Sequence, residues 1–193
     1  MSKTEHTVRT APPWQVAQWF NTDKPLSLEA LRGKVIVLEA FQMLCPGCVS
    51  HGLPQAARVS DTFDAEQVAV IGLHTVFEHH AAMTPTSLEA FLYEYRITFP
   101  VGVDQAGVGT DIPQTMLAYA MPGTPTLTLI DAQGRIRHQH FGQVSDLVLG
   151  AEIATLVNEA ETLREIAKVQ PAGKPVPPGC DGDACTLPSA ANA

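Results

Sequence analysis

The sequence predicts an α/β fold in which a central mixed β-sheet is flanked by helices on both faces. Continuous β-branched runs, such as residues 35–38, alternate with helix-length amphipathic segments. This alternation is typical of parallel strands buried on both faces. Later in the chain, two strand patterns are separated by a Gly-bearing turn and followed by a helix. This ending predicts an antiparallel hairpin in the same sheet.

Each predicted element follows from a local pattern of apolar spacing and of Gly and Pro. Residues 1–10 are polar and are expected to be loose, whereas the apolar patch over 14–20 predicts a turn or strand packed on the core. The next patterns predict a one-turn helix over 27–34 ended by Gly33, a strand over 35–38, a helix over 45–63 with a kink at Pro54, and a strand over 67–73. A helix capped by Thr86 or Ser87 is then expected to run to Arg96, with Tyr95 on its inner face. The remaining patterns predict a strand over 99–103, a helix over 112–119, a hairpin over 126–141 and a helix over 144–169.

These elements define one domain over residues 23–169. Residues 1–22 are expected to be an N-terminal extension. Residues 170–193 are expected to be a flexible tail, because the Pro, Gly and Ala that crowd this segment cannot form a core. The chain has 4 cysteines, one pair in the domain and one pair in the tail.

Composition excludes several classes of partner. The 193-residue chain has a formal net charge of -8, whereas a nucleic-acid-binding protein needs a basic face to neutralise phosphates. The apolar runs are strand-sized, far short of the ~20 residues that a membrane span needs. The N-terminus has no signal-peptide pattern. We therefore expect a cytoplasmic protein without a membrane span and without a nucleic-acid partner.

The first cysteine pair lies where a redox site is expected. Cys45 directly follows a predicted buried strand and opens a predicted helix, with Pro46 at the first helical position and Cys48 one turn later. Free amides and the positive end of the helix dipole favour a thiolate at Cys45. Cys48 can then attack a mixed disulfide formed at Cys45 and release the product. We assign Cys45 as the nucleophile and Cys48 as the resolving thiol.

Residues 35–48 (VIVLEAFQMLCPGC) resemble the active-site strand and helix of the thioredoxins, and the nearest branch resembles the TlpA-like/redoxin thiol-disulfide oxidoreductases. A second match lies far downstream, where residues 121–126 (MPGTPT) resemble the family's Gly-Thr-Pro-Thr segment. The resemblance covers roughly residues 26–157. It implies a thioredoxin-like fold, protein thiols and disulfides as substrates, and an electron donor such as a thioredoxin system. It implies no cofactor beyond the redox-active disulfide Cys45–Cys48.

The resemblance also implies roles for residues around the dithiol. Pro125 is expected to be cis, and Thr124 to present its backbone to an extended substrate segment beside Pro46 and Gly47. Glu39 corresponds to a buried acid beneath the resolving cysteine, where a carboxyl can relay the proton that Cys48 must lose. Acids are rare in fully buried strands, which favours this catalytic interpretation over a strand-end Glu reaching solvent.

The sequence departs from the thioredoxin pattern next to the dithiol. Thioredoxins carry Trp immediately before the first cysteine and another Trp nearby, where this chain has Leu44 and Gln42. The Pro46-Gly47 order is also reversed relative to thioredoxin. Partner recognition and reduction potential are therefore not carried over from that family.

A peroxiredoxin-like thiol peroxidase is the nearest alternative enzyme. Peroxide reduction needs Thr or Ser three residues before the nucleophile, where this chain has Gln42. The customary upstream proline is replaced by Leu38. We therefore do not expect efficient peroxidase activity.

Metal binding is the alternative from a different class. Cys45, Cys48, Cys180 and Cys185 could form a four-thiolate zinc site, although the first pair opens a helix behind a strand and the second has an x4 spacing. The other candidates are histidines. We interpret His74, His79 and His80 beside Glu78 as a solvated loop, and His138 and His140 as surface residues on one strand face. No metal site is predicted.

The tail pair has two further interpretations. Cys180 and Cys185 could close a small disulfide, or they could exchange electrons with the Cys45–Cys48 pair across the Pro-rich linker. Their acidic flank would slow such an attack by raising the pKa values of the thiols. The sequence therefore leaves two hypotheses open for this pair: a possible redox relay through Cys180 and Cys185, or two thiols without a role in a loose tail.

Overall fold

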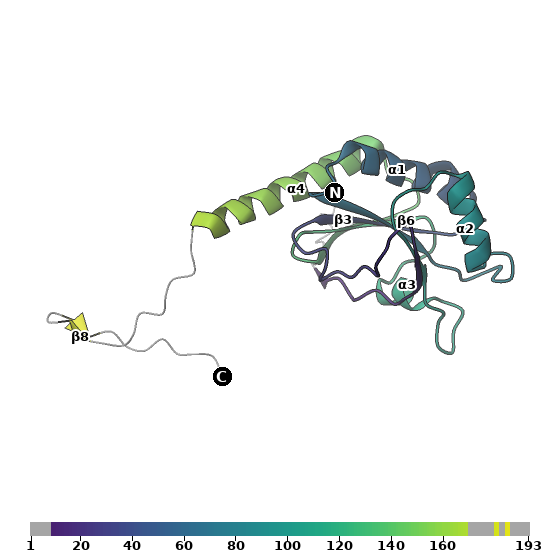
Figure 1. Cartoon of the computed structure of the whole chain (residues 1–193), viewed down its shortest axis with the longest axis horizontal. Coiled ribbons are helices and arrows are strands. Elements are labelled where there is room, and N and C mark those ends of the chain that lie inside the picture. Colours follow the sequence, from purple (N-terminus) through teal and green to yellow (C-terminus); the bar gives the residue numbers. More distant parts are fainter. Residues whose placement is uncertain (1–8, 170–179, 182–183, 186–193) are drawn as a thin grey trace, which may run out of the picture. The chain divides into compact units, whose positions relative to one another are not determined.

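The computed structural model describes residues 9–169, 180–181 and 184–185 (Figure 1). The chain divides into two units, Met1–Ala160 and Glu161–Ala193. The first unit contains a seven-stranded sheet in the order β1-β7-β6-β3-β4-β5-β2. Its strands are β1 (Arg9–Thr10), β2 (Val16–Phe20), β3 (Val35–Phe41), β4 (Val68–His74), β5 (Val101–Asp104), β6 (Thr126–Ile130) and β7 (Arg135–Phe141).

The sheet is mixed, as the sequence predicts. The central strand β3 runs parallel to β4 and antiparallel to β6, and β4 runs parallel to β5. The hairpin β6–β7 turns at Gly134, which has a φ of 75°, a conformation that glycine adopts without strain. The fold is therefore an α/β fold of the thioredoxin-like kind.

Helices cover both faces of this sheet. They are η1 (Cys48–Gly52), α1 (Leu53–Thr62), α2 (Pro85–Glu94), α3 (Gln114–Ala118) and α4 (Asp146–Val169). Buried residues of α1, α2 and α4 share one apolar core with one face of the sheet. Buried residues of α3 and of the N-terminal segment share a second core with the other face. In Figure 1, α1 and the part of α4 that belongs to the first unit lie above the sheet and α3 lies below it.

Strand β3 contributes side chains to both cores because successive side chains of a strand point to opposite faces. Val35, Val37 and Phe41 belong to the α1 and α4 side, whereas Ile36, Leu38 and Ala40 belong to the other side. All seven residues of the strand are buried. Glu39 falls in the first series, so its carboxyl is directed under the helix that carries the dithiol.

The helix after β3 begins as predicted and contains a π-helical turn. Its first helical residue is Pro46. At the end of η1, the Leu53 N–H donates to the Cys48 carbonyl five residues earlier. Pro54 has no N–H to donate, which favours this local change in the hydrogen-bond ladder. The predicted irregularity is therefore a π turn immediately before Pro54.

Both edges of the sheet come from the N-terminal segment. Strand β1 pairs antiparallel with β7, and β2 pairs antiparallel with β5. Between them, the Trp14 indole donates to the Tyr119 hydroxyl, which itself donates to the Pro12 carbonyl. The expectation of a loose segment was wrong for Arg9 and Thr10, and residues 1–8 lie outside the described part.

Other local expectations differ in detail. Residues 27–34 form a series of hydrogen-bonded turns instead of a helix, although Gly33 ends them with a φ of 88°. The N-cap of α2 is Thr84, whose hydroxyl accepts the Ser87 N–H, because Pro85 takes the first helical position. Tyr95 is largely exposed, not on the inner face. Among the described residues, no helix is both long and apolar enough to cross a membrane.

The second unit contains the end of α4 and a small pair of strands. Strand β8 (Cys180–Asp181) pairs antiparallel with β9 (Ala184–Cys185), so that the backbones of Cys180 and Cys185 face each other. The sequence predicted no ordered element here. The rest of the predicted flexible tail lies outside the described residues.

Candidate active site

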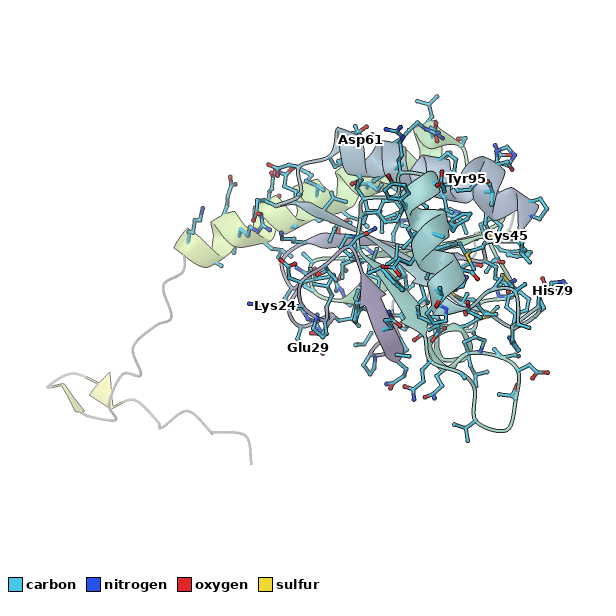
Figure 2. The ribbon with its side chains drawn as sticks, turned by 45° about the vertical axis from the view of Figure 1, so that its right-hand side comes forward. Lys24, Glu29, Cys45, Asp61, His79 and Tyr95 are labelled. Carbon is cyan, nitrogen blue, oxygen red and sulfur yellow. A yellow bond between two sulfur atoms is a disulfide. The ribbon has the colours of Figure 1, made fainter. Side chains whose placement is uncertain are left out.

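The two cysteines of the domain are joined in a disulfide at the start of the helical segment. Their Cα atoms are 5.3 Å apart. Cys45 is partly exposed, whereas Cys48 is completely buried. Figure 2 shows Cys45 at the opposite end of the η1–α1 segment from Asp61. An incoming group can therefore reach Cys45 but not Cys48.

Polar backbone groups surround the Cys45 sulfur. The Cys48 N–H donates to Cys45 Sγ at 3.2 Å. This amide is one of the free N–H groups at the helix start. On the other side, the Thr124 carbonyl oxygen lies 3.5 Å from the same sulfur. Once the disulfide is reduced, a donor already in place favours a thiolate at Cys45.

The segment before β6 closes the site opposite the dithiol. The Thr124–Pro125 peptide bond is cis. A Cβ atom added to Gly47 would lie 3.3 Å from Pro125 Cδ, so the proline ring packs directly on the Cys45–Cys48 turn. The Pro125 carbonyl accepts the Gly142 N–H, and the Thr126 hydroxyl donates to the Gly123 carbonyl. The structure therefore brings Gly47, Thr124 and Pro125 to the dithiol, and Pro46 is exposed beside them.

Glu39 is buried beneath this site. Its side chain is 1 % exposed, and its Oε1 atom has no hydrogen-bond partner among the described residues. Burial without a compensating charge raises the pKa of Glu39 to about 8. The carboxyl is therefore mostly protonated at neutral pH, and its ionised fraction grows as the pH approaches 8.

Gly52 provides the space for that carboxyl, and the sequence analysis missed it. A Cβ at this position would overlap Glu39 Oε1 and would lie 3.1 Å from Pro125 Cβ. Glu39 thus reaches the turn that begins at Cys48, next to the cis proline. The sequence feature that could have indicated this role is a glycine inside a helical pattern, because glycine is unfavourable there unless packing or function requires it.

Gln42 has a structural role at the position that a peroxidase uses for Thr or Ser. The side chain is 1 % exposed. Its Oε1 accepts the Phe77 N–H at 3.3 Å, and its Nε2 donates to Glu78 at 3.4 Å. It therefore holds the loop after β4. The neighbouring Leu44, where thioredoxins have Trp, is 57 % exposed.

One of the candidate histidines differs from the sequence interpretation. His74 is not in a solvated loop but is the buried last residue of β4, with its ring 5.3 Å from that of Phe41. Burial lowers the pKa of His74 to about 4, so the ring is neutral at pH 7. His79 and His80 are exposed. Among the described residues, a set of metal-type side chains converges elsewhere, at His138, His140 and Glu152.

The fold and the site together define a redoxin-type protein, with a thioredoxin-like sheet that carries a Cys-x-x-Cys disulfide opposite a cis proline. The chain belongs to the AhpC/TSA family, whose model matches residues 8–139.

Solved structures agree with this class. The chain is 64% identical to a thioredoxin-like superfamily protein, SPOA0173, over 77% of this chain and 96% of that one, with a TM-score of 0.76. It is 52% identical to a thiol-disulfide isomerase from Corynebacterium glutamicum over 76% of this chain and 96% of that one, with a TM-score of 0.73.

Curated relatives are more distant. Protein DipZ of Mycobacterium tuberculosis is 28% identical over 155 residues, which are 79% of this chain and 21% of DipZ. The chain therefore spans about a fifth of the length of that relative. Thioredoxin-like protein YneN of Bacillus subtilis is 24% identical over 119 residues, 62% of this chain and 63% of YneN.

Proposed function

We propose that this protein is a thiol-disulfide oxidoreductase that exchanges disulfides with protein substrates through Cys45 and Cys48. The observation that carries the proposal is the asymmetry of the dithiol, in which one sulfur is accessible and the other is buried behind it. A site with one entry sulfur and one resolving sulfur suits exchange through a mixed disulfide. The similarity to a thiol-disulfide isomerase also supports this chemistry.

In the reducing direction, the exchange takes two displacements. The Cys45 thiolate attacks one sulfur of a substrate disulfide, forms a mixed disulfide and releases the other substrate sulfur as a thiolate. The Cys48 thiolate then attacks Cys45 Sγ, which breaks the mixed disulfide and releases the second substrate thiol. Two electrons pass to the substrate, and the Cys45–Cys48 disulfide re-forms. The oxidising direction is the reverse.

Glu39 is proposed as the proton acceptor for Cys48. The resolving thiol is buried and must lose its proton before it attacks. With a pKa of about 8, a minority of the Glu39 carboxyls is ionised at neutral pH, and this ionised form can accept the Cys48 proton. The Glu39 carboxyl lies beside Gly52, in the turn that begins at Cys48, and this position supports the proposed role.

The proposed substrate is an extended segment of another protein that lies along Thr124, Pro125, Pro46 and Gly47. Main-chain pairing with Thr124 would give affinity without requiring a particular sequence. Two exposed apolar side chains support binding of a protein chain at this end: Leu44 next to Cys45, and Phe141, which packs on Gly123 and is 60 % exposed.

The partners and the compartment remain predictions. A thioredoxin-type system is the proposed electron donor, and the cytoplasm is the location that the sequence predicts. Expression of the Cys48→Ser variant in its host would address both questions, because the variant cannot resolve the mixed disulfides formed at Cys45. The trapped proteins would identify substrates and donor, and their compartment would locate the reaction.

The alternatives are less well supported. Gln42 is buried and engaged with Phe77 and Glu78, so it leaves no hydroxyl to hold a peroxide beside Cys45. For the four-thiolate zinc hypothesis, the Cys45 and Cys48 sulfurs are bonded to each other and are not thiolate ligands in this redox state. The relay through Cys180 and Cys185 remains a proposal. The backbones of these two residues face each other in the β8–β9 pair, which supports the proposal that they could form a disulfide with each other.

The direct test is the reduction of insulin disulfides by dithiothreitol. Wild-type protein should accelerate it, and Cys45→Ser should abolish the acceleration because the entry thiolate is lost. The matched control is the Cys180→Ser/Cys185→Ser variant, which should retain the activity because small thiols reach Cys45 directly. A Cys45→Ser variant as active as wild type would refute the assignment of the nucleophile.

A further inference from the structure

Two histidines of β7 converge on one carboxylate of α4. The Nδ1 atom of His138 lies 3.3 Å from one oxygen of Glu152, and the Nε2 atom of His140 lies 2.8 Å from the other. The three ligand-type atoms all lie within 4.8 Å of one another. The two imidazole planes are almost parallel, with an angle of 4° between them. The cluster therefore presents two imidazole nitrogens and a carboxylate toward one point.

The strand pattern explains why both rings face α4. His138 and His140 are two residues apart, so their side chains lie on the same face of β7. Gln139 between them faces the other way and donates to the Tyr119 carbonyl. The register of β6 and β7 shifts between Leu129 and Ile130, which places Arg137 on the α4 side as well.

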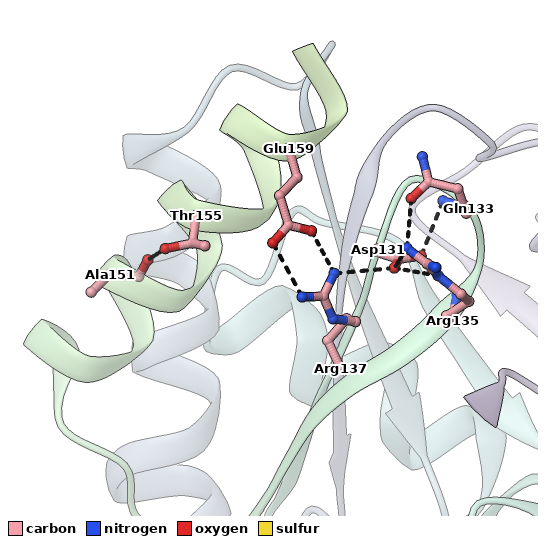
Figure 3. A network of polar contacts seen from close by, with 7 residues as sticks. All are labelled: Asp131, Gln133, Arg135, Arg137, Ala151, Thr155 and Glu159. Carbon is pink, nitrogen blue, oxygen red and sulfur yellow. Dashed lines mark hydrogen bonds and ion pairs between the residues drawn. The ribbon is translucent and has the colours of Figure 1, made fainter. Parts of the chain in front are cut away.

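Helix α4 is fixed at two points that flank Glu152 in sequence. Before it, Asp146 accepts hydrogen bonds from Gln55 at 2.6 Å and from Arg58 at 3.1 Å. After it, Glu159 forms a two-pronged ion pair with Arg137 of β7, which also reaches Asp131 (Figure 3). The backbone that carries Glu152 is therefore held in place relative to the strand that carries the histidines.

We propose that His138, His140 and Glu152 bind a divalent transition-metal ion, with zinc as the best match. The inference is independent of the thiol exchange proposed above. Imidazole nitrogens with one carboxylate are a zinc ligand set, and three protein ligands leave a fourth tetrahedral position for water. The side chains are only 18 to 30% exposed, so the site is partly shielded from solvent but remains open to an ion.

The geometry is close to what such an ion requires. Zinc binds nitrogen and carboxylate oxygen at about 2.0–2.2 Å, so neighbouring ligand atoms of a tetrahedral site are roughly 3.3–3.5 Å apart by the geometry of those bonds. The two nitrogen-to-oxygen distances, 3.3 and 2.8 Å, join the rings to different oxygens of Glu152. Binding of one ion through a single carboxylate oxygen therefore needs the carboxylate to turn and the separation of the ring nitrogens to change, and rotation about the side-chain bonds can provide both.

The test is calorimetric titration of the oxidised full-length protein with zinc chloride. The Cys45–Cys48 disulfide then withholds its two sulfurs from the metal. We expect one zinc ion to bind per chain. His140→Ala and Glu152→Gln should each weaken binding by more than about tenfold, because even the loss of a group that only hydrogen-bonds to a metal ligand weakens binding by about that much. Two controls should bind as wild type: His80→Ala, which removes an exposed histidine outside the cluster, and Cys180→Ser/Cys185→Ser, which removes the tail thiols.

A second measurement keeps the proposal testable if a variant fails to fold. X-ray absorption at the zinc edge of the wild-type complex should show nitrogen and oxygen neighbours, including imidazole, and no sulfur. Sulfur in the first coordination shell would place the metal on the cysteines and overturn the proposal. Failure of wild type to bind zinc, or unchanged binding by folded His140→Ala and Glu152→Gln, would overturn it too.

Discussion

Glu39 is an acid in a strand whose other six residues are apolar. Burial removes the water that would stabilise the ionised carboxylate, and this loss of hydration raises the pKa of Glu39. The native protein therefore binds this proton more tightly than the unfolded chain does. Between the ordinary pKa of 4.5 and the native value of about 8, the free energy of unfolding must fall as pH rises.

Replacement of Glu39 by Gln should slow resolution of a mixed disulfide near neutral pH, because Cys48 loses its proton acceptor. General bases of this kind contribute roughly 10²–10⁴-fold, and the loss should shrink as pH rises and Cys48 ionises unaided. Stopped-flow measurement of release from a Cys45-linked peptide checks this. Wild-type rates at every pH would mean that Glu39 is only structural.

The same Glu39→Gln variant provides an independent measure of the carboxyl's ionisation. Gln has no proton to lose, so its free energy of unfolding should lack the decline between pH 4.5 and 8. Relative to the variant, wild type should lose about 1.4 kcal/mol per pH unit across that window. Urea unfolding of the oxidised proteins across this pH range measures the difference.

His74 should make the protein sensitive to acid. Its ring has a native pKa of about 4 against an ordinary value of 6.5, so the unfolded chain binds the proton more readily and stability falls as pH drops through this interval. His74→Leu should remove that loss, about 3 kcal/mol over the whole interval. Urea unfolding at pH 7.5 and pH 4.5 measures it. His80→Gln, at an exposed position, should follow the wild-type curve, and a His74→Leu curve parallel to wild type would contradict the prediction.

At the scale of elements, Gly52 joins the dithiol helix to the strand below it. Alanine is ordinarily the better helix residue by about 1 kcal/mol. Here its Cβ would meet the Glu39 carboxyl and Pro125. Gly52→Ala should therefore destabilise the protein by about 1–3 kcal/mol, the usual cost of overpacking, as measured by urea unfolding.

Gly150 of α4 is the matched control for Gly52. A Cβ there meets nothing within 4 Å, so Gly150→Ala should stabilise the protein by roughly 0.5–1 kcal/mol. Combining Gly52→Ala with Glu39→Ala should recover part of the loss, because the clashing carboxyl is gone. Equal effects at the two glycines would show that the space at Gly52 is not needed.

The order of the core elements was predictable because each has a local signature. β3 is a continuous apolar run, the hairpin turns at a glycine, and the resemblance placed Cys45, Cys48 and Pro125 on the correct elements. The N-terminal strands were not predictable in the same way. β1 has only two residues, Arg9 and Thr10, and pairs with a strand more than a hundred residues away, so long-range pairing and not local preference decides its conformation.

The site was only partly predictable, because some of its residues act through contacts with parts of the chain that are distant in sequence. Glu39 could be singled out because an acid interrupts an apolar strand. Gly52 could not be, since its role depends on what lies across from it in space. His138 and His140 looked like surface residues because the sequence does not show that α4 places Glu152 above them.

For the whole molecule, removal of residues 171–193 should leave the domain folded. Among the residues that the structure describes, every member of the two apolar cores lies before residue 161. If the tail cysteines relay electrons, the truncated protein should be reduced more slowly or more rapidly by a large protein partner but unchanged by small thiols. Stopped-flow reduction with thioredoxin and with dithiothreitol makes this comparison.

A direct search for the link uses the Cys48→Ser protein with its full tail. Oxidation, digestion and mass spectrometry should yield a peptide that joins Cys45 to Cys180 or Cys185. Finding only dimers through Cys45, or a closed Cys180–Cys185 loop, would exclude the relay. The disulfide exchange proposed for Cys45 and Cys48 would stand in either case.

The two outer strands of the sheet come from one stretch of twelve residues, Arg9 to Phe20. An uncovered strand edge is a template on which another chain can add and begin aggregation. Here a single proteolytic cut near Trp14 would loosen both outer strands at once, and would uncover β5 together with the start of β7, at Arg135 and Ile136. Residues 9–20 therefore also limit self-association, and shortened forms that begin after residue 20 should precipitate even though their dithiol is intact.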